Sequence, residues 1–175
     1  MADYMGRPIM QEPRDLAIFD KFFEKCKIKT FIEFGTGHGG STLFFGIHCH
    51  KRGIEFYTYD NIQSTDFSMP IEQEINLGGS FKCLDIFSDE GMALIGGLIQ
   101  NSPKPLAIFF DNGDKPREWR IFAPLTIPGD YCIVHDYGTE FMDTDVGGVA
   151  VERIFVKESD ARAPGGWKAM WFKRI

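Results

Sequence analysis

Three features are scarce in this chain of 175 residues: excess positive charge, paired cysteines and long apolar runs. The net charge of −6 argues against a nucleic-acid partner, because phosphate backbones are bound by basic surfaces. The longest uninterrupted apolar run, residues 106–110, is far too short to cross a bilayer, and the first residues lack the apolar core of a signal peptide. We therefore expect no nucleic-acid partner, no membrane association and a cytoplasmic location.

The four cysteines form no CxxC pair and lack the spacing of a zinc site. They are Cys26, Cys49, Cys83 and Cys132, and each lies in or near an apolar segment. Free, buried thiols in a reducing compartment are the expected state.

Aromatic residues, by contrast, are abundant: the chain has 17 Phe and 3 Trp, and 43% of its residues are hydrophobic. This composition is enough for one full core and leaves little room for a second one. We predict a single domain over residues 1–175. It comprises a helical N-terminal segment (1–27), a cofactor-binding core (28–137), and a C-terminal helix and strand (138–175).

Helical and extended patterns alternate along the chain. Strands are expected at residues 30–34, 54–59, 81–84, 106–110, 131–134 and 167–172, and helices at 13–26, 41–52, 70–76, 89–100 and following Asp114. Segment 146–157 fits a helix and a strand almost equally well, and we assign it to a helix. The alternation predicts an α/β fold with a doubly wound, mostly parallel sheet of Rossmann-like type, covered by helices on both faces.

The most informative segment is FIEFGTGHGGS at residues 31–41. It is typical of a buried strand, a glycine-rich turn and the first residues of a helix. Glycine allows close approach of a ligand to the backbone, and the N-terminus of the helix offers free N–H groups. The predicted ligand-binding residues of this loop are Gly35, Thr36, Gly37, Gly39 and Ser41.

Acidic residues follow five predicted strands: Glu33, Asp60, Asp85, Asp111 and Asp136. Ligands of open α/β sheets bind at the carboxyl ends of the strands, whereas helix capping accounts for only some of these acids. Asp60 lies about twenty residues beyond the glycine loop, where a carboxylate binds ribose hydroxyls, and Asn61 flanks it. Asp85 is a candidate for the adenine amino group. The sequence thus predicts an adenosine pocket.

Two cofactors fit this pocket. Residues 35–40 also match the dinucleotide pattern G-x-G-x-x-G, which alone is weak evidence. Glu33 distinguishes between the two cofactors, because a nearby carboxylate repels the pyrophosphate of a dinucleotide and attracts the amino group of S-adenosylmethionine (SAM). This interpretation favours SAM.

These motifs resemble the class I SAM-dependent methyltransferases and, more narrowly, the cephalosporin hydroxylase / rhamnosyl O-methyltransferase family. The resemblance lies in PIMQEPRDL (residues 8–16), IEFGTGHGGSTL (32–43), FFDN (109–112) and GDYCIVHD (129–136). It implies methyl transfer to a hydroxyl of a small molecule or sugar. It also places Gln11 where it could close over the cofactor, although packing of the N-terminal helix explains Gln11 more simply.

The resemblance further implies a divalent metal, usually Mg²⁺, held by Asp111, His135 and Asp136. His135 departs from the pattern, because some members of the family carry Glu there. Imidazole suits manganese, iron or zinc better than magnesium, and His135 can alternatively serve as a general base. Lys115 is a further catalytic candidate, as a base or as a charge partner of Asp111.

The chain is too short for an added substrate domain. Contacts to the acceptor are therefore expected from the N-terminal segment, from the loop at 138–148, or from a neighbouring subunit of a homo-oligomer. Two alternative functions stay open at this point: an NAD-type oxidoreductase that uses the same glycine loop, and a non-catalytic module that binds SAM.

Overall fold

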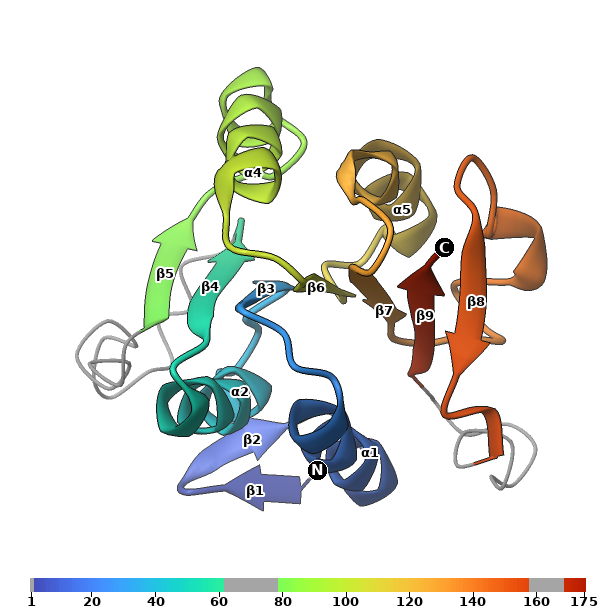
Figure 1. Cartoon of the computed structure of the whole chain (residues 1–175). Helices are drawn as coiled ribbons and strands as arrows, with labels where there is room; N and C mark the ends of the chain where they lie inside the picture. The colour runs from blue at the N-terminus through green and yellow to red at the C-terminus, as the bar shows by residue number, and fades with distance from the viewer. Residues whose placement is uncertain (1, 62–78, 158–168) are drawn as a thin grey trace.

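A twisted β-sheet forms the centre of the molecule (Figure 1). The computed structural model describes residues 2–61, 79–157 and 169–175, and within them the sheet has seven strands in the order β5-β4-β3-β6-β7-β9-β8. The strands are β3 (Thr30–Phe34), β4 (Glu55–Asp60), β5 (Gly79–Cys83), β6 (Leu106–Phe110), β7 (Tyr131–Val134), β8 (Val151–Ile154) and β9 (Met170–Arg174). The first five in sequence are parallel, whereas β9 is antiparallel to both β7 and β8.

Helices cover both faces of this sheet. They are α1 (Pro13–Lys25), α2 (Gly40–Arg52), α4 (Asp89–Asn101) and α5 (Lys115–Phe122). Figure 1 shows α1 and α2 on one face and α4 and α5 on the other. Strands β3 and β6 are buried along their whole length, as central strands covered on both sides must be. The predicted doubly wound, mostly parallel fold is therefore confirmed.

Local signals located most element boundaries correctly. Helix α1 begins at Pro13, whose missing N–H would have no partner in a first turn. The Asp114 side chain caps α5 by accepting a hydrogen bond from the backbone N–H of Arg117 at 3.1 Å. Helix α2 ends at Gly53, which takes the left-handed conformation.

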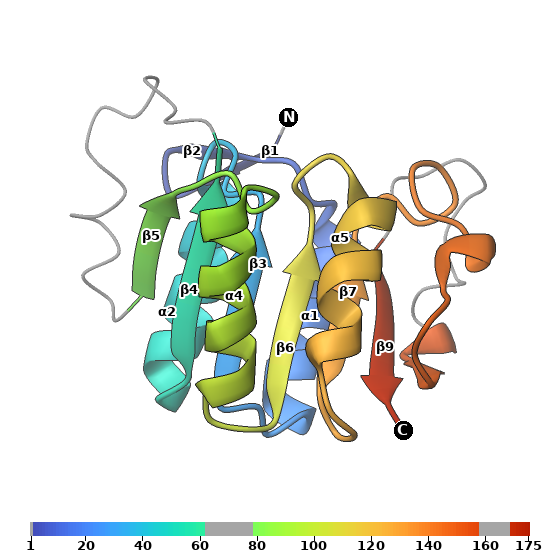
Figure 2. The same cartoon turned by 90° about the horizontal axis from the view of Figure 1, so that it is seen from above.

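The N-terminal segment contains an element that the sequence analysis missed. Strands β1 (Ala2–Tyr4) and β2 (Arg7–Ile9) form an antiparallel hairpin ahead of α1. The ring of Tyr4 packs edge-on against Phe44 of α2, with 5.6 Å between the ring centroids. Figure 2 shows the hairpin beside the sheet edge to which the parallel strands point. The N-terminal residues thus reach the carboxyl ends of the strands.

The predicted helix at 146–157 is wrong, because residues 151–154 form β8. This strand pairs antiparallel with β9, and Ile154 lies opposite Trp171. Its β-branched residues suit either structure at the level of local pattern, so pairing with a sequence-distant strand decided the outcome. The last strand also begins later than expected, at Met170. The predicted helix at 70–76 lies outside the described residues.

The four cysteines form no disulfide, as expected. Cys49 and Cys132 are buried, and burial raises the pKa of the Cys132 thiol to about 12. Cys26 is half-buried, and Cys83 is exposed on β5, so the expectation of burial is wrong for Cys83. No helix in the described part of the chain combines the length and apolarity that a membrane span requires.

Candidate cofactor and acceptor site

A cavity of about 710 Å³ lies at the carboxyl ends of the parallel strands. Its walls come from the N-terminal segment 8–13, the glycine loop and the ends of β4, β6 and β7. The predicted site residues that line it are Gly35, Thr36, Gly37, Gly39, Ser41, Asp60, Asn61, Asp111, His135 and Asp136. Glu33, Asp85 and Lys115 are not among its lining residues.

The glycine loop is held close to β6, and this requires glycine at its first position. Gly35 has a φ of +94°, and a Cβ there would lie only 2.3 Å from the carbonyl oxygen of Asp111. The loop is also tied to β4, because the Gly35 N–H donates to the Tyr59 carbonyl at 2.8 Å. The N-terminus of α2 follows directly, so its free N–H groups lie at the cavity.

Glu33 lies behind the loop rather than in the cavity. Its side chain is fully buried, and its Oε2 accepts hydrogen bonds from the hydroxyls of Thr42 at 2.6 Å and Thr58 at 2.7 Å. Burial raises the pKa of Glu33 to about 8, against the opposing effect of these two hydrogen bonds. Glu33 thus joins β3, β4 and α2 and is not among the residues that line the cavity.

The two acids expected to bind adenosine lie in different surroundings. Asp60, at the end of β4, lines the cavity and accepts a hydrogen bond from the Gly37 N–H at 2.8 Å. Asn61 is exposed beside it. Asp85 is exposed outside the cavity, and its Oδ1 accepts from the Phe87 N–H at 2.9 Å in the turn before α4. The structure therefore brings Asp60 and Asn61 to the site but not Asp85.

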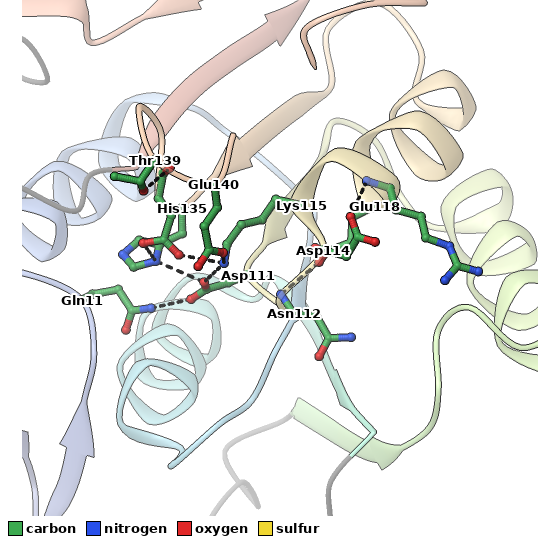
Figure 3. A network of polar contacts seen from close by, with 11 residues as sticks. Gln11, Asp111, Asn112, Asp114, Lys115, Glu118, His135, Thr139 and Glu140 are labelled. Carbon is green, nitrogen blue, oxygen red and sulfur yellow. Dashed lines mark hydrogen bonds and ion pairs between the residues drawn. The ribbon is translucent and has the colours of Figure 1, made fainter. Parts of the chain in front are cut away.

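A charged cluster occupies the cavity wall at the ends of β6 and β7 (Figure 3). His135 Nδ1 lies 3.1 Å from Asp111 Oδ1 and 3.1 Å from Asp136 Oδ1. Asp136 has a φ of +56°, a left-handed conformation that is uncommon outside glycine and recurs at functional sites. With this backbone conformation at Asp136, the carboxylates of Asp111 and Asp136 both lie beside the imidazole of His135.

Lys115 completes the cluster from the first turn of α5. Its Nζ lies 2.7 Å from Asp136 Oδ2, 2.7 Å from Glu140 Oε2 and 3.5 Å from Asp111 Oδ1, and the residue is only 3% exposed. Although burial opposes its charge, these carboxylates raise the pKa of Lys115 above its ordinary value. The geometry favours Lys115 as a charge partner, because a protonated amine cannot act as a base.

Asp111 and Asp136 favour the charged form of His135, as the carboxylates around Lys115 favour its charged form. Burial opposes the imidazolium, but the hydrogen bonds and charges of Asp111 and Asp136 raise the pKa of His135 to about 10. Burial also disfavours the charged form of Asp136, yet His135 and Lys115 lower its pKa. The cluster is therefore held together by mutual charge compensation.

The same cluster is suited to a divalent cation. Asp111, His135 and Asp136 each offer a ligand atom, and these atoms lie within 4.8 Å of one another. His135 Nε2 is buried and has no hydrogen-bond partner among the residues that the structure describes. With His135 neutral, the carboxylates of Asp111, Asp136 and Glu140 exceed the single ammonium of Lys115 by two charges, which one divalent cation would balance. A donor set of two carboxylates and an imidazole matches manganese, iron or zinc better than magnesium.

The sequence pattern undervalues Gln11, a residue of the cavity wall, and does not point to Glu118, which accepts a hydrogen bond from the backbone next to Asp111. Gln11 was attributed to packing, but its Nε2 donates to Asp111 Oδ2 at 2.8 Å and it lines the cavity. Its position within the family-like segment 8–16 was the available signal. Glu118 carried no signal. It is fully buried on α5, its Oε1 accepts from the Asn112 N–H at 3.2 Å, and burial together with Asp111 raises its pKa to about 8.

Known structures share this fold. CmcI with S-adenosylhomocysteine (SAH) superposes with a TM-score of 0.70 at 16% identity, over 99% of this chain and 81% of that one. CmcI with Mg and SAM gives 0.57 at 18% identity, over 77% of this chain and 57% of that one. An O-methyltransferase from Bacillus cereus with SAH gives 0.59 at 12% identity, over 94% and 82%. At such identities the likeness establishes the fold.

Sequence comparison supplies the relationship. Residues 1–84 match the family model Rhamnosyl O-methyltransferase/CmcI, which confirms the resemblance predicted above. The match covers slightly less than half of the chain, and together with the shared fold it supports a class I SAM-dependent methyltransferase. Comparison with curated proteins finds no match. The cavity of this protein lies at the strand ends where nucleotide ligands bind in open α/β sheets.

Proposed function

We propose that this methyltransferase transfers the methyl group of SAM to a hydroxyl of a small molecule or sugar, with a divalent cation held by Asp111, His135 and Asp136. One observation carries the proposal. A single cavity joins the glycine loop, which suits the cofactor, to a buried acidic cluster that suits a cation and a hydroxyl. The structures of CmcI with SAH, and with Mg and SAM, support both components by analogy.

Strand order sets the expected placement of the cofactor. The ribose hydroxyls belong near Asp60 at the end of β4, and the amino-acid part then crosses the end of β3 toward Asp111 on β6. The acceptor hydroxyl is then expected at the opposite wall of the cavity, beside His135 and Asp136, which follow β7. This order would direct the methyl group of the sulfonium toward the acceptor oxygen, as in-line transfer requires.

The chain's own residues have two tasks in this reaction. They align the hydroxyl with the activated methyl group, and they stabilise the charge that develops as the hydroxyl loses its proton. A bound cation would lower the pKa of that hydroxyl. Lys115 holds Asp111 and Asp136 in place through its contacts at 3.5 and 2.7 Å. The acceptor itself would be bound by residues 8–13, by the loop after β7, or by a neighbouring subunit.

Calorimetric titration tests the proposal directly. After treatment with EDTA, the protein is titrated with SAM and SAH in the absence and presence of Mg²⁺ or Mn²⁺, and methyl transfer from labelled SAM is measured on a panel of sugars and catechols. We expect SAH to bind, and Mn²⁺ to restore transfer lost with EDTA. Asp111→Asn should lower transfer by about 100-fold or more, whereas Asp89→Asn, at an exposed acid of α4, should not.

Two outcomes would identify the other functions. Binding of NADH without binding of SAH would favour an oxidoreductase. Binding of SAH, with a biological output that neither Asp111→Asn nor His135→Ala changes, would favour a non-catalytic sensor. Transfer that persists in EDTA would exclude the cation.

A further inference from the structure

The amide of Gln11 faces in two directions at the cavity wall. The residue is 3% exposed, and its Nε2 donates to Asp111 Oδ2 at 2.8 Å. Its Oε1 is buried and has no hydrogen-bond partner within the described part of the chain. Figure 3 shows the nitrogen turned to Asp111 and the oxygen turned away from it. One half of the amide is thus satisfied and the other half is not.

Chemistry fixes this orientation of the amide. The carboxylate of Asp111 only accepts hydrogen bonds, so the NH₂ group of Gln11 must face it and the oxygen must point elsewhere. A buried amide oxygen without a partner destabilises the folded protein. Because Gln11 lines the cavity, a donor group on a bound ligand can satisfy this oxygen.

The position of Gln11 selects among the donors that SAM carries. These donors are the ribose hydroxyls, the adenine amino group and the α-ammonium group of the methionine part. Asp60, the expected partner of the ribose, lies at the end of β4, whereas Gln11 contacts Asp111 at the end of β6, with β3 between them. The amino-acid part is the portion of SAM that extends in that direction.

We propose that Gln11 Oε1 accepts a hydrogen bond from the α-ammonium group of SAM. Gln11 is then a positioning residue that links the amino end of the cofactor to the carboxylate of Asp111. The main chain also supports this placement, since the N-terminal segment runs so close to α2 that a Cβ on Gly40 would lie 2.3 Å from the Pro8 carbonyl oxygen. The inference rests on the proposed function, because it needs SAM in the cavity.

The test compares two ligands on matched variants. The probes are SAH and its desamino analogue, in which 4-thiobutyrate replaces homocysteine. Gln11→Met keeps the length of the side chain and removes both polar atoms. It should raise the Kd for SAH about tenfold or more and leave the Kd for the analogue nearly unchanged. Gln100→Met, at an exposed glutamine of α4, should change neither value.

A second variant separates the two ends of the amide. Gln11→Glu keeps an acceptor oxygen and loses the donor to Asp111, so it should keep the preference for SAH over the analogue. Equal weakening of both ligands by Gln11→Met, no weakening of either, or loss of the preference in Gln11→Glu would overturn the inference while leaving the proposed function intact. Failure of the unaltered protein to bind SAH would instead overturn the proposed function.

Discussion

Glu33 shows how burial changes the role of a single residue. A carboxylate at the end of β3 was expected to attract the amino group of SAM by its charge. In the folded protein the group is fully buried, and burial raises its pKa to about 8. At neutral pH the neutral acid therefore prevails, and Glu33 acts through hydrogen bonds with Thr42 and Thr58. Its contribution to the site is the position of the loop.

The raised pKa of Glu33 predicts a pH dependence of stability. Because the folded pKa of about 8 exceeds the ordinary value of 4.5, the stabilising effect is complete below about pH 4.5 and is lost as the pH rises toward 8. Glu33→Gln imitates the neutral acid and removes this loss. The free energy of unfolding of the variant, relative to the unaltered protein, should rise by up to about 1.4 kcal/mol per pH unit between pH 5 and 7.

Urea unfolding at pH 5, 6 and 7 measures this difference. Glu55→Gln is the matched control, since Glu55 is exposed at the start of β4. Its stability should follow the pH curve of the unaltered protein. If the curves of Glu33→Gln and the unaltered protein run parallel over this range, the carboxyl of Glu33 is already ionised in the folded state.

At the scale of elements, the β1–β2 hairpin and α2 build one wall of the cavity together. A Cβ on Gly40 would lie 2.3 Å from the Pro8 carbonyl oxygen, so a side chain at the start of α2 would push the segment containing Gln11 away. Gly40→Ala should therefore lower the free energy of unfolding by about 1–3 kcal/mol and weaken SAH binding. Chemical denaturation and calorimetry measure the two effects.

Gly97 provides the control for this change. It lies within α4, and a Cβ there would meet nothing within 4 Å. Gly97→Ala should stabilise the protein by up to about 1 kcal/mol, because alanine favours the helix more than glycine does. Equal effects of the two substitutions would show that the hairpin does not pack on α2 in solution.

At the scale of the whole molecule, aromatic side chains pack the N-terminal helix α1 against α2 and against strands of the sheet that are far apart in sequence. The ring of Phe19 on α1 makes edge contacts with Phe45 of α2, Phe109 of β6 and Trp171 of β9, with centroid separations of 4.7, 5.2 and 5.3 Å. These residues are distant in sequence and fully buried. One ring thus links four elements that position the site.

Phe19→Ala should destabilise the protein severely. The expected loss is about 3–5 kcal/mol, a large part of the total stability of a typical domain. Phe87→Ala is a suitable comparison, because Phe87 is half-buried and lies at the surface. The Cζ of Arg117 is 4.1 Å from the centroid of its ring. Its loss should be clearly smaller in thermal or denaturant unfolding. A similar loss for both would mean that the cluster around Phe19 is not a principal part of the core.

The candidate site was predictable where it depends on backbone position. Asp60 ends its strand, and the glycine loop, Asp111 and His135 directly follow theirs. Parallel strands bring such positions to one edge of the sheet. Asp85 obeys the same pattern, yet it follows the edge strand β5 and serves the turn before α4. The pattern of acids at strand ends thus identifies the edge but not which acids line the cavity.

Local sequence pattern was sufficient to predict the alternation of strands and helices, the glycine loop and the edge of the sheet that carries the site. These features depend on local spacing and on backbone freedom within a few residues. Long-range packing, in contrast, turns Glu33 inward, encloses Lys115 with carboxylates and makes residues 151–154 a strand. Each of these outcomes depends on burial or pairing with distant segments, which local pattern does not encode.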